Sequence, residues 1–309
     1  MHAPRSRPDR SPAIPEASMT RFVKLFALGL LLLPNVVGAQ QAPRPGSGGN
    51  PIDPDAPRPI DALESVWIEE LTFMEVRDAI RSGKTTVIVP TGGVEENGPY
   101  LAGGKHNYIL QQTAEAVARK LGNALIAPII KYVPEGEIDL EPGTIRYPGT
   151  IGVRVETFKA VLTDVSPALR ANGFEHIVLI GDSGGNQQPQ VEVAEALSAK
   201  WTDGKTGIHH IPEYYNWVDR QQWLRERGIN EVMQDPGLHD EFSATSIMML
   251  TDPTTVRMEQ RIRAGHFSIN GVDLAPIPRT LALGSELVDW IADLTVAAIN
   301  EATGETDGS

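Results

Sequence analysis

Residues 176–187 read His-Ile-Val-Leu-Ile-Gly-Asp-Ser-Gly-Gly-Asn-Gln, and this stretch decides the fold class. Residues 177–180 are β-branched or apolar without a break, which predicts a buried strand. A glycine-rich turn follows at residues 181–186, and the apolar residues of 187–201 then recur at helical spacing. A strand, a glycine turn and a helix in this order indicate a βαβ unit with a parallel sheet.

The same order recurs on both sides of this stretch. Strands are predicted at residues 85–89, 124–130 and 207–212, and helices at 107–121, 155–169, 244–250 and 281–302. Because the strands are apolar along their whole length, we expect helices on both faces of the sheet. We therefore predict an α/β fold: one domain over residues 62–303, with three αβα layers and a mostly parallel sheet. Ligands of such sheets bind beyond the carboxyl ends of the strands.

The ends of the chain have a different composition. Met19 to Ala39 combine two basic residues, an apolar run and a small-residue cleavage signal, which is typical of a signal peptide over residues 1–39, with Met19 as an alternative start. Residues 40–61 are rich in Pro and Gly and predict a flexible leader, and residues 304–309 a disordered tail. We expect an exported protein, periplasmic or secreted, without stable membrane insertion after cleavage.

Composition narrows the possible chemistry. The chain of 309 residues has 40 acidic and 27 basic residues, a formal net charge of −13 and no cysteine. An acidic chain is repelled by phosphate backbones, so we expect no nucleic-acid partner. Without cysteine there are no disulfides, thiolate metal sites or cysteine nucleophiles. A metal would have to be held by His, Asp, Glu or neutral oxygen donors.

Three polar clusters follow predicted strands or precede predicted helices. Glu95, Glu96 and His106 lie after the first strand and could share a divalent cation, although the alternative is that they cap backbone amides and the next helix. Asp182 is placed at the end of a strand, where it is either a ligand or base or an N-cap. His239 precedes an apolar helix, as a general base or a capping residue.

Ser183 offers a second kind of chemistry. Gly181-Asp-Ser-Gly-Gly185 resembles the nucleophile segment of chymotrypsin-like serine proteases. Those proteases are all-β, whereas this chain alternates strands with helices, so the structural context of that motif is absent. A serine at a sharp strand-to-helix turn still leaves a nucleophile of another type as an alternative.

Several ordered segments together resemble the creatininase (creatinine amidohydrolase) family. The family's Gly-Ser-x-Glu-Gln-His-Gly-Pro-His-Leu loop, with an Asp further on, matches Gly92 to Leu101 with His106. Its Asn-Gly-His-x-x-Asn loop matches residues 181–186, and its other segments match residues 147–150, 239–246 and 270–273. The resemblance spans about residues 66–300 and implies a creatininase-like catalytic domain.

The departures from the family pattern fall on its metal ligands. The family binds two divalent metals; Glu95 keeps one ligand, while Asn97, His106, Ser183 and Gly185 stand where the family has other residues or an occasional acid. The second metal site is therefore expected to be lost. We expect one ion, held by Glu95, His106 and Asp182, with zinc favoured over manganese or iron.

The resemblance implies a metal-dependent hydrolase of a cyclic amide or related C–N bond, with a lactone as a further substrate class. In this hypothesis a metal-activated water attacks a carbonyl, Glu96 or His239 transfers protons, and the amides of Gly184 and Gly185 stabilise the oxyanion. The alternatives are a metal-free hydrolase using Ser183 with His106 or His239, and a non-catalytic ligand-binding protein. The expected partners are a small-molecule substrate and further copies of the chain in a homo-oligomer.

Overall fold

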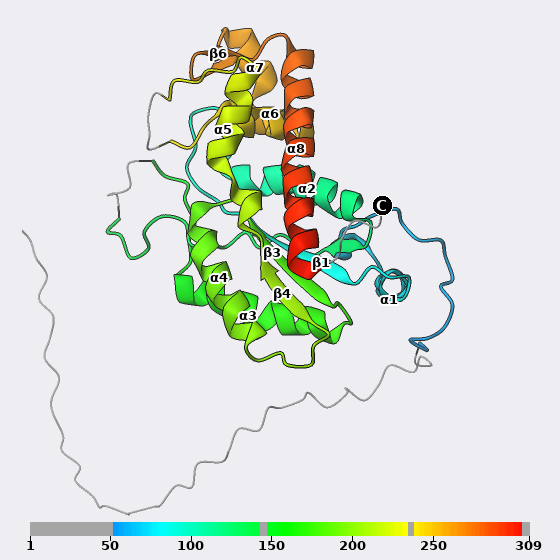
Figure 1. Cartoon of the computed structure of the whole chain (residues 1–309). Helices are drawn as coiled ribbons and strands as arrows, with labels where there is room; N and C mark the ends of the chain where they lie inside the picture. The colour runs from blue at the N-terminus through cyan, green and yellow to red at the C-terminus, as the bar shows by residue number, and fades with distance from the viewer. Residues whose placement is uncertain (1–51, 143–146, 234–237, 305–309) are drawn as a thin grey trace, which may run out of the picture. The chain divides into compact units, whose positions relative to one another are not determined.

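The computed structural model describes residues 52–142, 147–233 and 238–304, which belong to one α/β unit (Figure 1). Its main sheet has the strand order β2-β1-β3-β4, from β1 (Thr86–Thr91), β2 (Ala124–Ile126), β3 (His176–Gly181) and β4 (Gly207–His210). Every pairing in this sheet is parallel, with Thr86 opposite both Ala124 and His176. The predicted parallel sheet is therefore confirmed.

Helices cover both faces of this sheet and complete the predicted αβα layers. Ile88, Ile126 and Val178 face one apolar cluster, which includes residues of α2 (Lys105–Leu121), α5 (Trp217–Glu226), α6 (Phe242–Thr251) and α8 (Ile277–Thr303). Val87 and Ile177 face the other cluster, with α1 (Phe73–Arg81), α3 (Val155–Ala171) and α4 (Gly184–Ser198). The alternation follows from the strand period of two.

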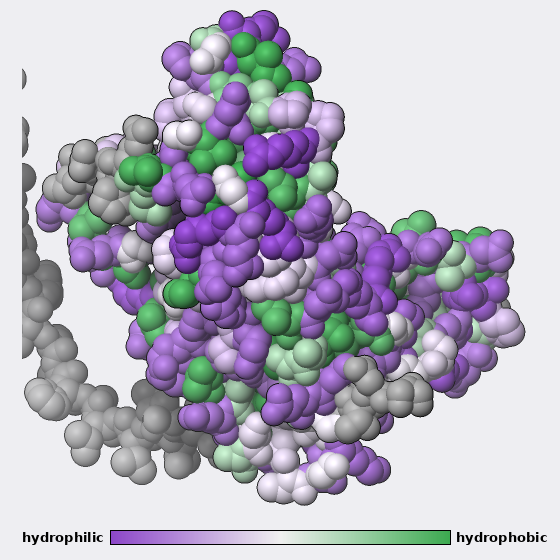
Figure 2. Space-filling model, turned by 45° about the horizontal axis from the view of Figure 1, so that its top comes forward, coloured by the Kyte–Doolittle hydropathy of each residue, from purple (hydrophilic) through white to green (hydrophobic). Residues whose placement is uncertain are grey.

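The remaining elements are short. They are the 3-10 turns η1 (Ile68–Glu70), η2 (Pro212–Tyr215) and η3 (Pro253–Val256), the helix α7 (Met258–Ala264), and the antiparallel pair β5 (Ser268–Ile269) and β6 (Val272–Asp273). On the face drawn in Figure 2, hydrophobic side chains lie in small patches between hydrophilic ones, which is ordinary for a protein surface.

Four helices begin earlier than the sequence predicted, and the shifts of α2 and α4 matter for the site. α2 begins at Lys105 rather than at Asn107, and α4 begins at Gly184 rather than at Gln187. Lys105 and His106 therefore stand in the first turn of α2, and Gly184 and Gly185 in the first turn of α4. Both first turns lie at the carboxyl ends of strands β1 and β3, where the chemistry was expected.

Most of the predicted terminal segments lie outside the described residues: the whole signal peptide (1–39), residues 40–51 of the leader and 305–309 of the tail. The described part of the leader contacts α1, since Arg77 donates a hydrogen bond to the carbonyl of Ala56 (2.8 Å) and Arg58 pairs with Asp78 (2.7 Å). Within the described ranges, no helix combines the length and apolar character needed to cross a membrane.

Candidate active site

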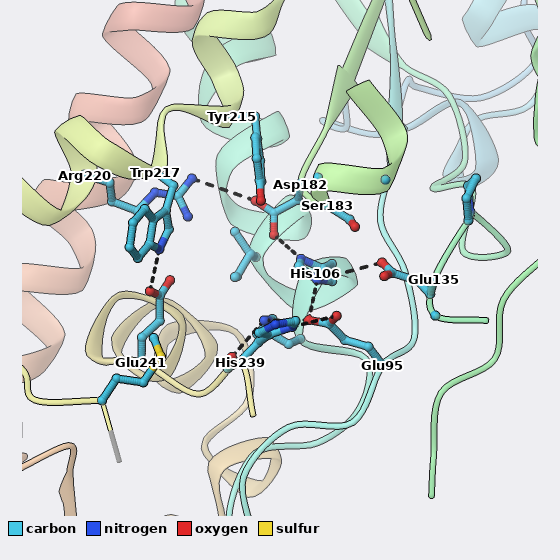
Figure 3. A pocket seen from close by; sticks show the side chains of 17 residues that line it. Glu95, His106, Glu135, Asp182, Ser183, Tyr215, Trp217, Arg220, His239 and Glu241 are labelled. Carbon is cyan, nitrogen blue, oxygen red and sulfur yellow. Dashed lines mark hydrogen bonds and ion pairs between the residues drawn. The ribbon is translucent and has the colours of Figure 1, made fainter. Parts of the chain in front are cut away.

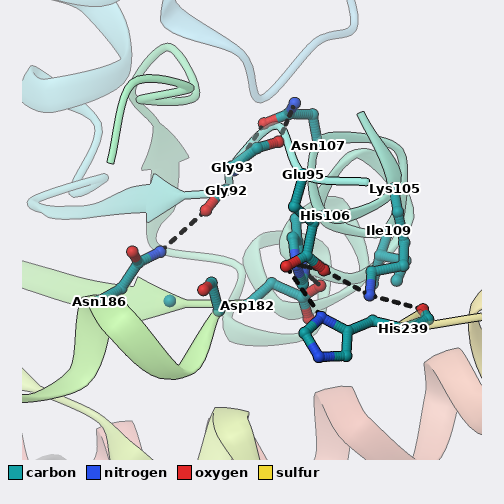
Figure 4. A network of polar contacts seen from close by, with 12 residues as sticks. Gly92, Gly93, Glu95, Lys105, His106, Asn107, Ile109, Asp182, Asn186 and His239 are labelled. Carbon is teal, nitrogen blue, oxygen red and sulfur yellow. Dashed lines mark hydrogen bonds and ion pairs between the residues drawn. The ribbon is translucent and has the colours of Figure 1, made fainter. Parts of the chain in front are cut away.

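Hydrogen bonds connect the loop that follows β1 to the loop that follows β3, below the site. Asn186, in the first turn of α4, donates to the carbonyls of Thr91 (3.1 Å) and Gly92 (2.9 Å) (Figure 4). Asn107 of α2 accepts from the amide of Gly93 (3.3 Å) and donates to its carbonyl (2.8 Å). A Cβ on Gly92 would lie 2.1 Å from the Asn107 side chain, so this close approach requires glycine. The loops are thereby held where their polar side chains converge.

His106 lies at the centre of the site between two carboxylates. Its Nδ1 is 2.8 Å from Oδ2 of Asp182, and its Nε2 is 2.9 Å from Oε1 of Glu95. Burial alone would lower the pKa of His106, but the hydrogen bonds to Asp182 and Glu95 outweigh it and raise the pKa to about 9. In the absence of a metal the ring is therefore an imidazolium that donates from both nitrogens.

Glu95 contacts three cationic or potentially cationic groups. Besides His106, the Lys105 ammonium lies 2.8 Å from Oε1 and the His239 Nδ1 lies 3.0 Å from Oε2. Burial would raise the pKa of Glu95, but the hydrogen bonds from His106 and His239 and the charge of Lys105 hold it well below its usual range. Glu95 is thus a fixed carboxylate at the floor of the site.

Lys105 and His239 link this carboxylate to the rim. The Lys105 side chain is only 7% exposed and also donates to the backbone carbonyl of His239 (2.8 Å). The His239 side chain is 58% exposed, and its hydrogen bond to Glu95 raises its pKa. A histidine in this position can exchange protons with solvent while it remains tied to the buried charges.

Glu135 is the site residue that the sequence analysis missed. It lies in the segment between β2 and α3, and its buried Oε1, 4.0 Å from Nε2 of His106, makes no hydrogen bond to a described residue. Burial and the charge of Glu95 raise the pKa of Glu135, and the Ser183 hydroxyl opposes this. The sequence signal that could have found it is an acidic residue between Pro134 and Gly136, in a third loop that follows the carboxyl end of a strand.

These groups line a cavity of about 480 Å³ (Figure 3). Five of the predicted site residues line it: Glu95, His106, Asp182, Ser183 and His239. The sixth, Glu96, is not among the lining residues, and its backbone amide donates to the Thr150 hydroxyl (3.1 Å). The geometry therefore gives no support to the proton-transfer role expected of Glu96.

Three of the lining side chains fit a metal ion in number and chemistry. Glu95, His106 and Glu135 each offer one ligand atom, and these atoms lie within 4.8 Å of one another. Two carboxylates and an imidazole suit zinc, manganese or iron. The unpartnered oxygen of Glu135 supports the fit, because a buried carboxylate oxygen without a donor is costly unless something binds it.

Asp182 was predicted as a metal ligand, and its carboxylate contacts Nδ1 of His106 and lies outside the group of three close ligand atoms. Metal-bound histidines commonly donate their second nitrogen to a carboxylate, which fixes the ring orientation. In this arrangement Asp182 is placed to orient His106, and Glu135 offers the third close ligand atom.

The Lys105 ammonium competes with a metal ion for the Glu95 carboxylate. Lys105 Nζ contacts the same Glu95 oxygen that accepts from His106. An ion bound to Glu95 and His106 would replace the proton on Nε2 of His106 and would share Glu95 with an ammonium. Metal affinity at this site is consequently expected to be lower than in a site without the lysine.

The site is thus a cluster of carboxylates and an imidazole at the carboxyl edge of a parallel α/β sheet. The chain belongs to the creatininase family, whose model, described as creatinine amidohydrolase, matches residues 69–299. The family membership predicted from the sequence is confirmed.

Two curated relatives are similar over much of the chain. The 3-dehydro-scyllo-inosose hydrolase of Thermotoga maritima is 25% identical over 195 residues, which are 63% of this chain and 58% of that protein. The creatinine amidohydrolase of Pseudomonas putida is 24% identical over 233 residues, 72% of this chain and 86% of that protein. The chain thus spans less than two thirds of the first relative's length.

Solved structures of creatininase share the fold. A creatinine amidohydrolase structure superposes with a TM-score of 0.53 at 21% identity and covers 79% of this chain and 98% of the other. A manganese creatininase structure gives a TM-score of 0.54 at 21% identity, over 77% and 98% of the two chains. At this identity the likeness establishes the fold, and the chemistry has to be argued from the residues present.

Proposed function

We propose that this chain is a hydrolase that opens a cyclic amide or a related C–N bond of a small molecule, with a lactone as a further substrate class. The observation that carries the proposal is the buried cluster of Glu95, His106 and Glu135 in a cavity of about 480 Å³ at the carboxyl edge of the sheet. Membership in the creatininase family and the hydrolase names of the two curated relatives support it.

The proposed cofactor is one divalent metal, with zinc favoured, held by Glu95, Glu135 and Nε2 of His106. When bound, such an ion lowers the pKa of a water and polarises a carbonyl. Asp182 keeps the His106 ring in place through Nδ1 (2.8 Å), as described above.

The protein's own groups supply proton transfer and charge stabilisation. His239, at the rim and with a raised pKa, is placed to protonate a leaving nitrogen. The amides of Gly184 and Gly185 open α4 and face the cavity, where they can stabilise an oxyanion.

The geometry weighs against the alternative in which Ser183 is the nucleophile. Both nitrogens of His106 are occupied by Glu95 and Asp182, so this histidine is not free to accept the serine proton. The Ser183 hydroxyl instead interacts with Glu135. A serine nucleophile needs a base within hydrogen-bond reach, and His106 does not provide one here.

The test combines metal content with turnover. We would purify the chain without chelator, reconstitute it with zinc, and measure bound metal by mass spectrometry in the parent, His106→Ala, Glu135→Gln and Glu137→Gln. Glu137 is an exposed acid of the same loop and serves as the matched control. Hydrolysis of hydantoin, dihydrouracil, creatinine and γ-butyrolactone would be followed by product mass.

We expect about one zinc per chain in the parent and in Glu137→Gln, and its loss in the other two variants together with turnover. A parent that binds no metal after reconstitution would contradict the metal-dependent mechanism. Labelling of Ser183 by a fluorophosphonate would then favour the serine alternative, and a folded protein without turnover on any of these substrates would favour the binding protein.

Export and homo-oligomer formation stay predictions from the sequence. Cell fractionation tests the first, and light scattering coupled to size-exclusion chromatography tests the second.

A further inference from the structure

Arg220 is a buried cation whose hydrogen-bonding capacity is not used by the residues around it. It lies on α5, is 5% exposed, and lines the cavity. Its nearest carboxylate is Asp182, with Nη2 3.9 Å from Oδ1, which is longer than a hydrogen bond. Its Nε is fully buried and has no hydrogen-bond partner among the described residues. A guanidinium in this position is costly unless something binds it.

The charges around Arg220 are already matched to other partners. Asp182 accepts from His106 at 2.8 Å, and Glu95 accepts from His106 at 2.9 Å and forms an ion pair with Lys105 at 2.8 Å. Glu241, the remaining carboxylate of this wall, accepts from the Trp217 indole at 3.0 Å and from Gln221 at 2.9 Å (Figure 3). Arg220 is therefore left with one weak ion pair at 3.9 Å.

A second feature of the same cavity also favours negative charge. The 15-residue helix α4 begins at Gly184, and its N-cap residue Ser183 makes no side-chain capping hydrogen bond. The first amides of a helix have no intrahelical partner, and they carry the positive end of the helix dipole. The Tyr215 hydroxyl lies beside this turn, since a Cβ on Gly184 would be 3.3 Å from it. Gly184, Gly185, Tyr215 and Arg220 all line the cavity.

We propose that Arg220, the Tyr215 hydroxyl and the first amides of α4 form a subsite for a carboxylate, so that the substrate of this cavity is an anion. The inference rests on the proposed function in that it names the substrate class of the same cavity. A single carboxylate matches the one cation left without a close partner, and the planar guanidinium suits two parallel hydrogen bonds to its oxygens. Arg220 then determines specificity and takes no part in bond cleavage.

The experiment measures binding without turnover, with a matched pair of small probes. Succinate and succinamide have similar size and differ in charge. Isothermal titration calorimetry would compare them on the full chain after metal is removed with EDTA and the EDTA is removed by dialysis into metal-free buffer, so that neither a bound metal nor the chelator competes for the carboxylate. The variants are Arg220→Met, Arg220→Lys and the control Arg225→Met, which removes an exposed arginine of the same helix.

We expect the parent and Arg225→Met to bind succinate at least tenfold more tightly than succinamide, and Arg220→Met to lose this preference. Arg220→Lys should retain part of it, because lysine keeps the charge without the planar fork. The proposal is overturned if the parent binds both probes alike, if it binds neither, or if folded Arg220→Met keeps the preference. If Arg220→Met does not fold, the test rests on the parent, which must prefer succinate, and on Arg220→Lys, which must show a weaker preference.

The outcome is separable from that of the proposed function. A parent that binds succinate selectively but hydrolyses none of the ring compounds would retain the anion subsite and lose the hydrolase. A parent that hydrolyses neutral rings without any preference for succinate would retain the hydrolase and lose the subsite. Inorganic phosphate is the third probe, and binding of phosphate at least as tightly as succinate overturns the assignment to a carboxylate.

Discussion

Replacing Lys105 with methionine is expected to raise the affinity of the site for zinc. The Lys105 ammonium is buried and lies 2.8 Å from Oε1 of Glu95, the carboxylate that would also hold an ion. Methionine has nearly the same length and fits a buried position, but it carries no charge. The substitution therefore removes a cation from the place where a second cation has to bind.

The size of the effect can be bounded from the geometry. A divalent and a monovalent cation about 4 Å apart repel by about 8 kcal/mol at an effective dielectric constant of about 20. The lysine can avoid this by turning away, which costs its ion pair with Glu95 and its hydrogen bond to the His239 carbonyl, about 2–4 kcal/mol. The less costly of these two responses determines the free-energy penalty that Lys105 imposes on zinc binding. We expect Lys105→Met to bind zinc at least tenfold more tightly, which corresponds to about 1.4 kcal/mol.

Competition with a fluorescent zinc chelator would measure this affinity in the parent, Lys105→Met and Lys120→Met. Lys120 is the matched control, because it lies on the same helix and pairs with Asp293 at 2.6 Å, away from the cavity. The Lys120→Met substitution should leave zinc affinity unchanged. Zinc affinity in Lys105→Met equal to or weaker than in the parent would refute the reasoning, since Lys105 would then help to build the metal site.

Three further predictions concern stability and the cavity wall. Burial and the charge of Glu241 raise the pKa of Glu231 to about 7, so its contribution to stability is present below its ordinary pKa and is lost as pH rises through about 7. Glu231→Gln should therefore reduce the difference in unfolding free energy between about pH 5 and pH 8 by about 1–2 kcal/mol, measured by urea titration at each pH. A Cβ on Gly185 would lie 2.3 Å from the Pro134 carbonyl, so Gly185→Ala should cost about 1–3 kcal/mol and reduce turnover, measured by urea denaturation and product formation. Leu110→Ala should lower the unfolding free energy by about 2–5 kcal/mol in the same titration, because this side chain is fully buried. An unchanged pH profile, a fully active Gly185→Ala or a Leu110→Ala loss below about 1 kcal/mol would contradict the respective prediction.

The parts of the fold that the sequence predicted are those with strong hydrophobic periodicity. β3 and the helices α2, α3 and α8 were expected from apolar runs or from an amphipathic repeat, and they form with ends shifted by a few residues. The short helices α1, α5 and α7 were missed; α5 is polar on average and lacks this signal, whereas α1 is amphipathic although polar on average. The nine residues of α1 are instead started by a capping box at Thr72.

The site was predictable to the extent that it depends on strand ends. Glu95, His106 and Asp182 were expected at neighbouring carboxyl ends, and the structure brings them within hydrogen-bond distance. Glu135 was missed because it lies in an irregular segment whose path is set by tertiary contacts. Lys105 was missed because the helix was expected to begin two residues later, and the helix start determines that the lysine turns inward.

The buried cations explain how a creatininase fold can keep its carboxylates close together with fewer of the family's metal ligands. The resemblance implies two divalent ions, and here Lys105 and Arg220, together with His106 while no ion is bound, bring positive charge into the same cavity, each no more than 7% exposed. Glu95 and Asp182 therefore have cationic partners whether or not an ion is bound. Buried carboxylates without such partners would repel each other and shift towards their neutral forms. The lysine and the histidine thus stabilise the arrangement of the site, and a bound ion is left to affect mainly the reactivity of water and substrate.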